Sequence, residues 1–490
     1  MNRRWLFADQ LGPHFLDDPG QPVLLVESRA AFARRPVHRR RAHLLLSALR
    51  HRAAELGDQA LLVQSQTYEQ GRAEAGGELT VCAPTTWAAR RLVARLPDVT
   101  VLPARGFGTG EEEFAAWAGR RGQRRLLMED FYRDARRRLD ILMDGADPAA
   151  GRWNFDADNR EPPPAGGLSL PAPPAFEEDE IDEQVRRDLD AWQRSGDVRL
   201  TGQDGPREFP VTRSEALESL RSFVRDRLPV FGPQQDAMLA GDPVMAHSML
   251  SPALNLGLLD PVECAHAAED AYRAGRAPLA SVEGFIRQLI GWRDYVWNLY
   301  WHFGDNYRHR NALGAREPLP RWFAELDAES VTARCLSDAL ARVRGHGHAH
   351  HIIRLMVLGN YAIQRGWDPE QVTEWFRVNF VDGYDWVMVP NVVGMSQHAD
   401  GGLMATKPYL GGGAYINRMS DYCGPCPYRP AVRLGPDACP FTAGYWSFLD
   451  RHADRFAANP RMARPVKGLN RLADLRQVTA QEKERGSDPP

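Results

Sequence analysis

Short apolar runs alternate with stretches of helical spacing over the first 130 or so residues. Apolar residues recur at helical spacing in Ala42 to Leu56 and in Trp87 to Leu96. Strands separated by helices form βαβ units, so we expect residues 1–130 to form a Rossmann-like α/β domain with a parallel five-stranded sheet. The runs that predict its strands are Trp5 to Phe7, Val23 to Glu27, Leu61 to Gln64, Thr80 to Ala83 and Val99 to Pro103.

The pattern changes after this region. Prolines and glycines crowd the stretch that begins at Asp144, and an acidic run from Glu177 to Glu183 ends it. This composition breaks regular elements, so residues 131–213 are predicted to be a linker region. Residues 214–490 are mostly helical by their spacing, as in Ile286 to Val296 and Ile352 to Ile363. We therefore predict a small α/β domain followed by a large all-α domain.

Composition adds few constraints. The chain is 43% hydrophobic and 26% charged, with a formal net charge of −3. That charge argues against non-specific coating of nucleic acid but leaves room for a local basic groove. No apolar run has the length of a signal peptide or of the about 18 residues that a membrane span needs. We expect a soluble cytoplasmic protein with no membrane partner.

Two local patterns that could bind phosphate are better explained without a ligand. Gly106 to Gly110 has the sequence G-F-G-T-G and lacks the register of a dinucleotide-binding loop, so we predict an ordinary loop. The arginines between Arg34 and Arg41 predict a solvated helix face.

Polar residues follow the first two predicted strands. Asp9 and Gln10 lie at the end of the first strand, and Glu27 lies at the end of the second. In open parallel sheets ligands bind beyond the carboxyl ends of the strands, so these three side chains are candidates for ligand binding. Each of them could equally cap a turn or a helix.

Three segments of the helical part carry polar groups that suit a nucleotide-like ligand. Ser248 and Ser251 lie at the start of a predicted helix, where hydroxyl and free backbone N–H groups suit a pyrophosphate; ordinary helix capping is the alternative. Gln288 to Arg293 places an amide, an indole and a guanidinium on one helix. Asn379 to Met395 adds carboxylates, an amide and aromatic rings, a mixture that suits a heterocycle.

Four histidines lie within six residues, at His346, His348, His350 and His351. His350 and His351 are adjacent, so they cannot share one helix face. The spacing of His346 and His350 leaves a metal site open. An acid/base role for one imidazole is the simpler reading, since histidine alone titrates near neutral pH.

The cysteines carry the strongest chemical signal. Cys423-Gly-Pro-Cys426 is followed by a third cysteine, Cys439. Thiolates this close either ligate a metal or oxidise, and the lack of an export signal favours a metal or iron–sulfur centre over disulfides. Position alone does not choose the fourth ligand among Cys335 and the two remaining cysteines, Cys82 and Cys264.

These motifs, taken in order, resemble the photolyase/cryptochrome superfamily. The segments that carry the likeness are Leu250-Ser-Pro, Gln288 to Arg293, His350-His-x-x-Arg354, Val381-Asp-x-Tyr-Asp-Trp386 and Met419 to Pro427. The last of them is similar to the iron–sulfur branch, which comprises bacterial cryptochromes and prokaryotic (6-4) photolyases. The resemblance spans nearly the whole chain, from Phe7 to the region of Cys439.

The resemblance implies three cofactors. FAD would lie in the helical domain, a [4Fe–4S] cluster would be held by cysteines, and an antenna, 6,7-dimethyl-8-ribityllumazine in this branch, would lie near Asp9, Gln10 and Glu27. The residues that match the family's flavin contacts are Ser248, Leu250, Ser251, Gln288, Arg293, Arg354, Asp382 and Asn391. Those that match its cluster ligands are Cys335, Cys423, Cys426 and Cys439.

The resemblance also implies light-dependent repair of UV-damaged DNA by a monomer. The His-His pair is similar to that of (6-4) photolyases, which makes His351, with His350 beside it, the expected proton donor to the lesion. Trp292 and Tyr409 would wall the site that accepts the flipped bases. The alternatives are a blue-light receptor with the same cofactors and no useful repair, and a light-independent nucleic-acid-binding protein with a structural metal centre.

Two departures from the family pattern concern electron and proton supply. Many relatives have Trp-Thr-Gly upstream of the first cluster cysteine, whereas this chain has no tryptophan between Asp327 and Cys335. Trp375 remains for electron transfer, but its neighbour Phe376 is a poor relay. Met388 replaces a carboxylate that some relatives carry near the flavin.

Overall fold

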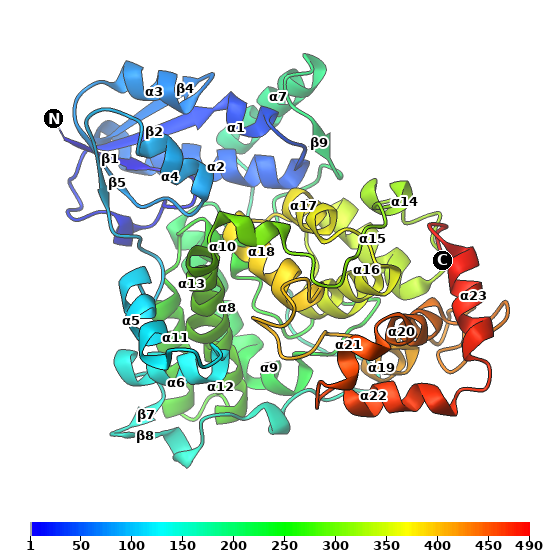
Figure 1. Cartoon of the computed structure of the whole chain (residues 1–490). Helices are drawn as coiled ribbons and strands as arrows, with labels where there is room; N and C mark the ends of the chain where they lie inside the picture. Colours follow the sequence, from blue (N-terminus) through cyan, green and yellow to red (C-terminus); the bar gives the residue numbers. More distant parts are fainter. Residues whose placement is uncertain (1) are drawn as a thin grey trace.

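The computed structural model of the chain, described for residues 2–490, begins with a parallel five-stranded sheet (Figure 1). The strand order is β4-β2-β1-β5-β6, with β1 in the centre. The strands are β1 (Arg3–Leu6), β2 (Val23–Ser28), β4 (Ala60–Ser65), β5 (Leu79–Cys82) and β6 (Val99–Leu102). Every pairing among them is parallel, so the predicted sheet is confirmed.

Helices surround this sheet and continue beyond it. They are α1 (Arg29–Ala33), α2 (Arg39–Leu56), α3 (Tyr68–Ala75), α4 (Trp87–Val93), α5 (Glu111–Arg121), α6 (Met128–Leu139) and α7 (Glu180–Arg194). Helix α2 begins three residues before the apolar period does, because the His38 side chain accepts a hydrogen bond from the Arg40 N–H and caps it.

Two short pairs of strands were not predicted from the sequence. β3 (Val37–His38) pairs in parallel with β9 (Leu200–Thr201), and β7 (Met143–Asp144) pairs antiparallel with β8 (Asp147–Pro148). Two residues are too few to show a period of two. The first pair ties the segment after α7 back to the start of α2.

The stretch predicted as a linker contains two ordered helices, α6 and α7. The acidic run starts α7, because Asp179 accepts hydrogen bonds from the N–H groups of Ile181 and Asp182. Val185, Leu189 and Trp192 of α7 are buried in a small core shared with α2. Residues 159–179 are the longest run in this stretch that forms neither helix nor strand.

The remainder of the chain is helical, which confirms the predicted fold class. Its α-helices are α8 (Arg213–Asp226), α9 (Leu228–Gln234), α10 (Ser251–Asn255), α11 (Pro261–Arg273), α12 (Leu279–Ile286), α13 (Asp294–Phe303), α14 (Arg321–Ala324), α15 (Arg334–His346), α16 (Asn360–Arg365), α17 (Pro369–Asn379), α18 (Asp385–Val389), α19 (Gly413–Met419), α20 (Pro440–Arg451), α21 (Ala453–Ala457), α22 (Ala463–Gly468) and α23 (Leu475–Arg485). Three π-helical segments interrupt or extend them, namely η5 (Arg287–Arg293), η7 (Ile353–Gly359) and η8 (Pro390–Ser396).

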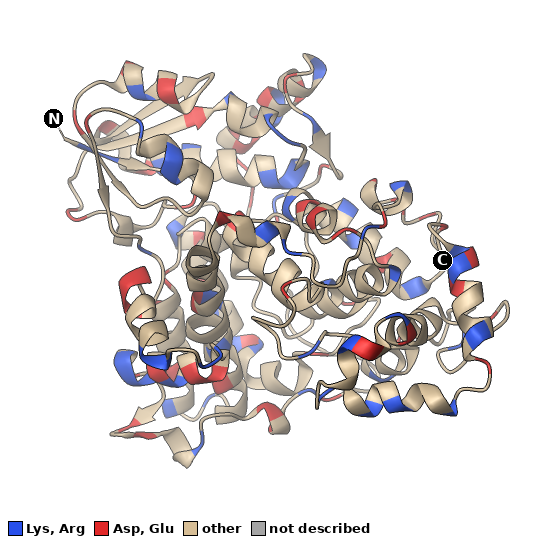
Figure 2. Ribbon diagram, in the orientation of Figure 1, with Lys and Arg blue, Asp and Glu red and all other residues tan. Residues whose placement is uncertain are grey.

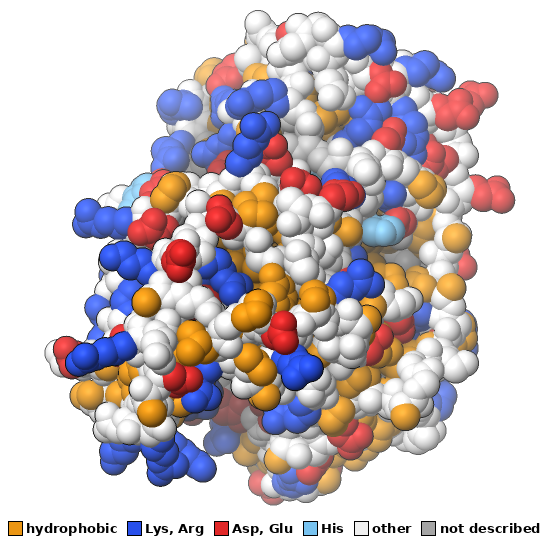
Figure 3. Space-filling view, turned by 90° about the vertical axis from the view of Figure 1, so that its right-hand side faces the viewer, with side chains coloured by type: hydrophobic (Ala, Val, Ile, Leu, Met, Phe, Trp, Pro, Cys, Tyr) orange, Lys and Arg blue, Asp and Glu red, His pale blue; other side chains and the backbone are white. Residues whose placement is uncertain are grey.

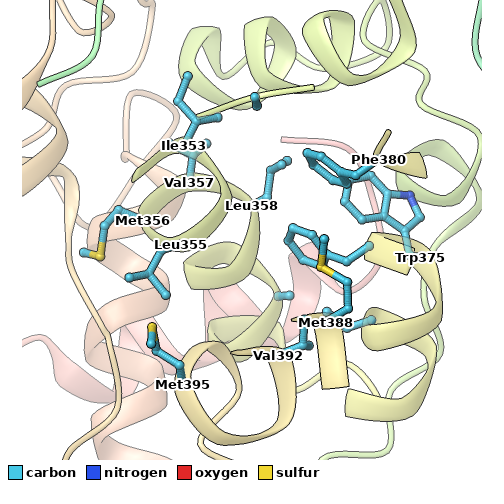
Figure 4. Close-up of a cluster of buried hydrophobic side chains, with 14 of the residues drawn as sticks. Ile353, Leu355, Met356, Val357, Leu358, Trp375, Phe380, Met388, Val392 and Met395 are labelled. Carbon is cyan, nitrogen blue, oxygen red and sulfur yellow. The ribbon is translucent and has the colours of Figure 1, made fainter. Parts of the chain in front are cut away.

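Charge separates the outer helices from the inner ones. Figure 2 shows charges of both signs along α5, α6 and α23 and basic residues along α22, whereas α13 carries few charges. Inside, η7, α17, α18 and η8 pack their apolar side chains together, and Leu358, Trp375, Phe380, Met388 and Val392 lie close to one another (Figure 4). None of the helices between residues 2 and 490 combines the length and apolar character of a membrane span.

Candidate active site

The three π-helical segments carry four of the residues that the sequence links to a cofactor. Gln288 and Arg293 lie in η5, Arg354 lies in η7 and Asn391 lies in η8. A π turn inserts one extra residue into a helix and is frequent at functional sites, because it moves side chains away from the regular helical face. The sequence period gave no sign of these turns.

A glycine lets each π turn approach its neighbour closely. A Cβ on Gly291 would lie 3.2 Å from the Tyr132 ring, and one on Gly394 would lie 2.5 Å from the Tyr307 hydroxyl. A Cβ on Gly359, in η7, would overlap the Oγ of Ser396 in η8. The two turns that carry Arg354 and Asn391 therefore contact each other through a position where only hydrogen fits.

A buried ion pair joins η7 to the segment before α18. Arg354 donates from Nη1 to Asp382 Oδ1 over 2.8 Å and from Nη2 to Oδ2 over 3.0 Å. Ser251 at the start of α10 donates to the same carboxylate over 2.7 Å. We call Ser251, Arg354 and Asp382 the Asp382 cluster; its members come from three segments far apart in the sequence.

The surroundings fix the charge of Asp382. The carboxylate is 4% exposed. Burial acts to raise its pKa, but the charge of Arg354 and the hydrogen bonds from Arg354 and Ser251 outweigh burial and lower the pKa to about 2. Arg354 is itself fixed, since its Nε donates to Ala349 O over 2.5 Å and its guanidinium lies 4.2 Å from the centre of the Phe380 ring. The cluster is thus a rigid paired charge at neutral pH.

The other residues predicted to contact the cofactor differ in exposure and in hydrogen-bond partners. Gln288 is exposed although the rest of its turn is mostly buried. Leu250 is buried, and Ser248 accepts a hydrogen bond from the Leu250 N–H in a local turn. Asn391 donates to Val387 O in its own helix over 2.8 Å.

Arg293 lies apart from the Asp382 cluster. Its guanidinium donates to Gly106 O over 2.8 Å and to Leu254 O over 3.3 Å, and lies 4.4 Å from the centre of the Phe107 ring. It therefore ties the loop at 105–110, predicted as an ordinary loop and observed as one, to the end of α10.

His351 is both accessible and desolvated. Its side chain is exposed, yet the surrounding chain desolvates the imidazole and, with the charge of Arg354, lowers its pKa to about 4. A group with both properties lies on a concave surface, where a ligand can reach it. On the face shown in Figure 3, Lys and Arg are interspersed with Asp and Glu among apolar side chains.

His350 points into the protein and stacks on a histidine that the sequence did not single out. The rings of His247 and His350 lie 4.3 Å apart at an angle of 17°. His350 is 2% exposed, and neither of its ring nitrogens has a protein partner; His247 Nε2 also lacks one. Buried polar atoms of this kind call for a water or ligand partner.

His346 does not join this group. α15 ends at His346, and Gly347 follows in the left-handed conformation with φ 60°. His346 and His350 are therefore not one turn apart on a helix, and His346 instead lies 2.7 Å from Glu208 Oε1. Within residues 2–490 neither histidine takes part in a three-ligand metal cluster.

The predicted aromatic residues occupy different environments. Trp292 and Tyr409 are half-buried, and Trp292 makes an edge contact with Tyr295. Trp375 is buried and donates from Nε1 to Phe323 O over 2.9 Å. Phe323 lies between Trp375 at 4.4 Å and Trp367 at 4.7 Å, measured between ring centres, so aromatic contacts continue past Trp375 through residues that sequence reasoning missed.

The four predicted cluster cysteines converge from three segments. Cys335 lies in the first turn of α15, Cys423 and Cys426 lie in the loop after α19, and Cys439 caps α20. A Cβ on Gly413 would lie 2.7 Å from Cys439 Sγ, so a glycine again permits a close approach. The other two cysteines, Cys82 and Cys264, are buried elsewhere.

The pKa values of Cys335, Cys423 and Cys439 in this four-cysteine site are raised. Burial, and then the charges of the other three cysteines, raises the pKa of Cys335 well above its usual range. Burial and the neighbouring sulfurs raise the pKa of Cys423 to about 12. No arginine or lysine is among the causes, so the protein itself supplies no charge to stabilise the thiolates.

The three predicted antenna residues separate into two kinds. Gln10 is 1% exposed and donates to Cys82 O, while Glu27 is 4% exposed and accepts two hydrogen bonds of 2.8 Å from Arg50. Both side chains are buried and hydrogen-bonded to other parts of the protein. Asp9 is half-buried, accepts a hydrogen bond from Thr85 and has its pKa raised by burial.

Asp9 faces residues from both halves of the chain. Its charge acts on the hydroxyl groups of Tyr68 in α3 and Tyr384 before α18, and burial with this charge raises the pKa of Tyr68 to about 12. Arg41 lies 5.2 Å from the centre of the Tyr384 ring and donates to Arg377 O. The basic run is therefore not a solvated face at this position, and Arg41, Tyr68 and Tyr384 are site residues that the sequence did not reveal.

Known proteins are similar to this chain in sequence. The family model described as deoxyribodipyrimidine photo-lyase-related protein matches residues 4–197. The (6-4) photolyase of Agrobacterium fabrum is 38% identical over 498 residues, which cover 96% of this chain and 95% of that protein.

Two solved structures have the same fold. A bacterial class III photolyase from Agrobacterium tumefaciens matches with a TM-score of 0.59 and 16% identity, over 99% of this chain and 96% of that one. The Synechocystis sp. PCC6803 cryptochrome matches with a TM-score of 0.59 and 16% identity, over 99% of both chains. The fold is thus that of photolyases and cryptochromes. With 38% identity to the Agrobacterium fabrum enzyme over nearly its full length, the chain belongs to the photolyase/cryptochrome superfamily, in the branch of the bacterial (6-4) photolyases.

Proposed function

We propose that this protein repairs (6-4) pyrimidine photoproducts in DNA in the light, with FAD as its cofactor. The observation that carries the proposal is the Asp382 cluster, which joins η7 to the start of α10 and to the segment before α18, together with the exposed, desolvated His351 three residues before Arg354. Its 38% identity to a (6-4) photolyase supports the choice of substrate.

The residues present fit a flavin. The Asp382 cluster offers charged hydrogen-bonding groups held in place by their own contacts, and Gln288 presents an amide to solvent from an otherwise mostly buried turn. The unpartnered nitrogens of His247 and His350 supply further polar atoms. Bound FAD would supply light absorption and a single electron to the lesion. Ser251, Arg354, Asp382 and Gln288 would hold and orient it, with Ser248, Leu250 and Asn391 alongside.

His351 would act on the lesion by proton donation. With a pKa of about 4 in the free protein, roughly one imidazole in a thousand carries a second proton at pH 7. Phosphates of bound DNA favour the charged form, so docking of the substrate would raise that fraction. Trp292 and Tyr409, both half-buried, would contact the flipped bases.

The four-cysteine site would hold an iron–sulfur cluster rather than one zinc ion. A tetrahedral zinc site with Zn–S bonds of about 2.3 Å places its sulfurs roughly 3.8 Å apart. In the described chain, no three cysteine sulfurs lie within 4.8 Å of one another. The wider spacing supports a polynuclear centre, and we propose [4Fe–4S].

An antenna pigment would bind where Asp9 meets Tyr68 and Tyr384. We propose a ribityllumazine, because a flat heterocycle with a polyol suits aromatic hydroxyls beside a carboxylate and the Arg41 guanidinium. Gln10 and Glu27 would support this site indirectly, through the contacts they already make.

The test is an anaerobic repair assay on oligonucleotides with a defined (6-4) or cyclobutane lesion, in light and in darkness. We expect light-dependent repair of the (6-4) lesion, lost in His351→Ala with flavin still bound. His346→Ala is the matched control, because His346 pairs with Glu208 outside the site. Repair of neither lesion by flavin-loaded protein would contradict the proposal and favour a photoreceptor. Full activity of His351→Ala would remove the histidine from the mechanism.

The pH dependence of the same assay gives a second readout. At limiting DNA the rate reports the free protein, so it should rise as pH falls from 8 towards 5, because protonated His351 becomes more abundant. A rate that is flat over this range in the wild type would exclude imidazolium as the donor.

A further inference from the structure

A group of metal-ligand side chains lies where α2 and α7 meet, and it shares no residue with the sites described above (Figure 1). His51 of α2, Asp179 and Asp182 each place one potential ligand atom within 4.8 Å of those of the other two. It is the one group of this kind among residues 2–490.

In both carboxylates one oxygen accepts hydrogen bonds from backbone N–H groups at the start of α7. The other oxygen of each makes no such bond. Asp179 Oδ1 accepts from the N–H groups of Ile181 and Asp182 at 2.9 and 3.3 Å. Asp182 Oδ2 accepts from the Asp179 N–H at 3.3 Å. Asp182 is fully buried, and its Oδ1 has no hydrogen-bond partner. Burying an oxygen without a partner lowers the stability of the fold unless a proton or a cation binds to it.

The orientation of His51 sharpens this requirement. Its Nδ1 lies 2.8 Å from Ser47 O, and a carbonyl can only accept, so Nδ1 carries hydrogen. In a neutral ring Nε2 then presents a lone pair, and it lies 3.2 Å from Asp179 Oδ2. A lone pair and a carboxylate oxygen repel each other unless a positive species lies between or on them.

The local charge balance is also negative. Arg207 is a cation beside the group, and its Nε lies 3.4 Å from Asp182 Oδ2. Arg207 already makes two hydrogen bonds to Glu215, of 2.8 and 2.9 Å. The three carboxylates of Asp179, Asp182 and Glu215 and the one guanidinium of Arg207 leave a net charge of −2. A divalent cation would balance that charge.

We propose that His51, Asp179 and Asp182 bind one Zn²⁺ ion. Zinc accepts imidazole nitrogen and carboxylate oxygen at about 2.0–2.2 Å, which in a tetrahedral site separates two ligands by roughly 3.3 Å. The 3.2 Å between Nε2 and Asp179 Oδ2 matches this separation. The Asp179 side chain is 56% exposed, so the ion can enter from solvent and water can complete its coordination. The ion would tie α7 to α2.

The experiment titrates zinc chloride into the intact protein with its iron cluster in place. Zinc and iron per chain are measured by mass spectrometry and zinc affinity by calorimetry. We expect one zinc per wild-type chain and loss of binding in His51→Ala, with iron unchanged in both. Asp179→Asn should weaken binding by about tenfold or more, and it preserves folding because asparagine also caps helices.

Glu55→Gln is the control, since it removes a carboxylate from the same helix outside the group. It should bind zinc like the wild type. The opposing explanation is an imidazolium at His51 that pairs with Asp179 without a metal. Equal zinc uptake by wild type and His51→Ala would overturn the proposal, because zinc would then bind without His51. Uptake by neither would also overturn it and would favour the metal-free pair.

A measurement on the wild type alone covers the case in which variants fold poorly. Zinc should raise the midpoint of thermal unfolding, and a chelator that leaves the iron content unchanged should reverse the rise. An unchanged midpoint at saturating zinc would again count against the site.

Discussion

Asp382 and Cys335 are both buried acids, and their surroundings shift their pKa values in opposite directions. Burial acts to raise the pKa of each. At Asp382 the guanidinium of Arg354 outweighs burial and the pKa falls to about 2. At Cys335 the neighbours are three more cysteines, whose charges raise the pKa further.

These opposite pKa shifts indicate which of the two sites needs a bound ligand to be stable. The Asp382 cluster brings its own counter-charge, so it is formed before any cofactor binds. Among residues 2–490 no arginine or lysine is a cause of the raised pKa values of Cys335 and Cys423. The proposed metal centre would supply the positive charge that four thiolates need. We therefore expect the fold to depend strongly on the proposed iron centre and weakly on the flavin.

The largest expected effect comes from Cys423→Ala. Removing one ligand should abolish the cluster and with it the folding energy that ligation supplies, so little soluble protein should be recovered. Iron per chain and the thermal midpoint measure both. Cys264→Ala, a buried cysteine outside the site, should keep its iron. Normal iron in Cys423→Ala would contradict the ligand assignment.

Asp382→Asn tests the Asp382 cluster, the site that carries its own counter-charge. It leaves Arg354 buried and unpaired, which should cost about 3 kcal/mol of unfolding free energy. The carboxylate has a folded pKa of about 2 against an ordinary 3.8. Its contribution, about 2 kcal/mol, is therefore present above pH 4 and lost as the pH falls through 2.

Urea unfolding at several pH values checks this sign. The wild type should lose stability between pH 4 and 2 more steeply than the variant does. Glu329→Gln is the matched control, because Glu329 also makes a two-bond pair with an arginine, Arg344, but on the exposed surface. It should change little, since solvent screens exposed pairs. Equal losses in both variants would refute the buried role of Asp382.

The smallest effect is expected from Ser251→Ala. It removes one 2.7 Å hydrogen bond to Asp382 and leaves the two from Arg354. We expect a loss of about 1 kcal/mol and a modest drop in flavin affinity, measured by calorimetry with FAD. Ser248→Ala, whose hydroxyl serves a local turn, should affect FAD less. The reverse order would mean that Ser248 is the main contact.

The sequence predicted those features that local pattern encodes. Each of the five strands shows as an apolar run, and the Cys-x-x-Cys loop is visible as spacing. The pairing of Ser251 with Asp382 was not visible, since 131 residues separate them. The position of Arg41 also depended on tertiary contacts, because a basic run has the same pattern whether it is solvated or lies on a tyrosine ring.

The π turns mark the limit of periodicity. One inserted residue turns a helix by about 100°, but these three segments are mostly buried on all sides, so no change of polar face marks the shift. The apparent pairing of His346 with His350 failed for a related reason. Counting residues assumes an unbroken helix, and Gly347 ends it.

Gly359 has a consequence for how this protein can change. Since any side chain there would strike Ser396, the two positions cannot vary independently while both turns keep their places. Related chains that acquire alanine at position 359 should therefore carry a glycine at position 396.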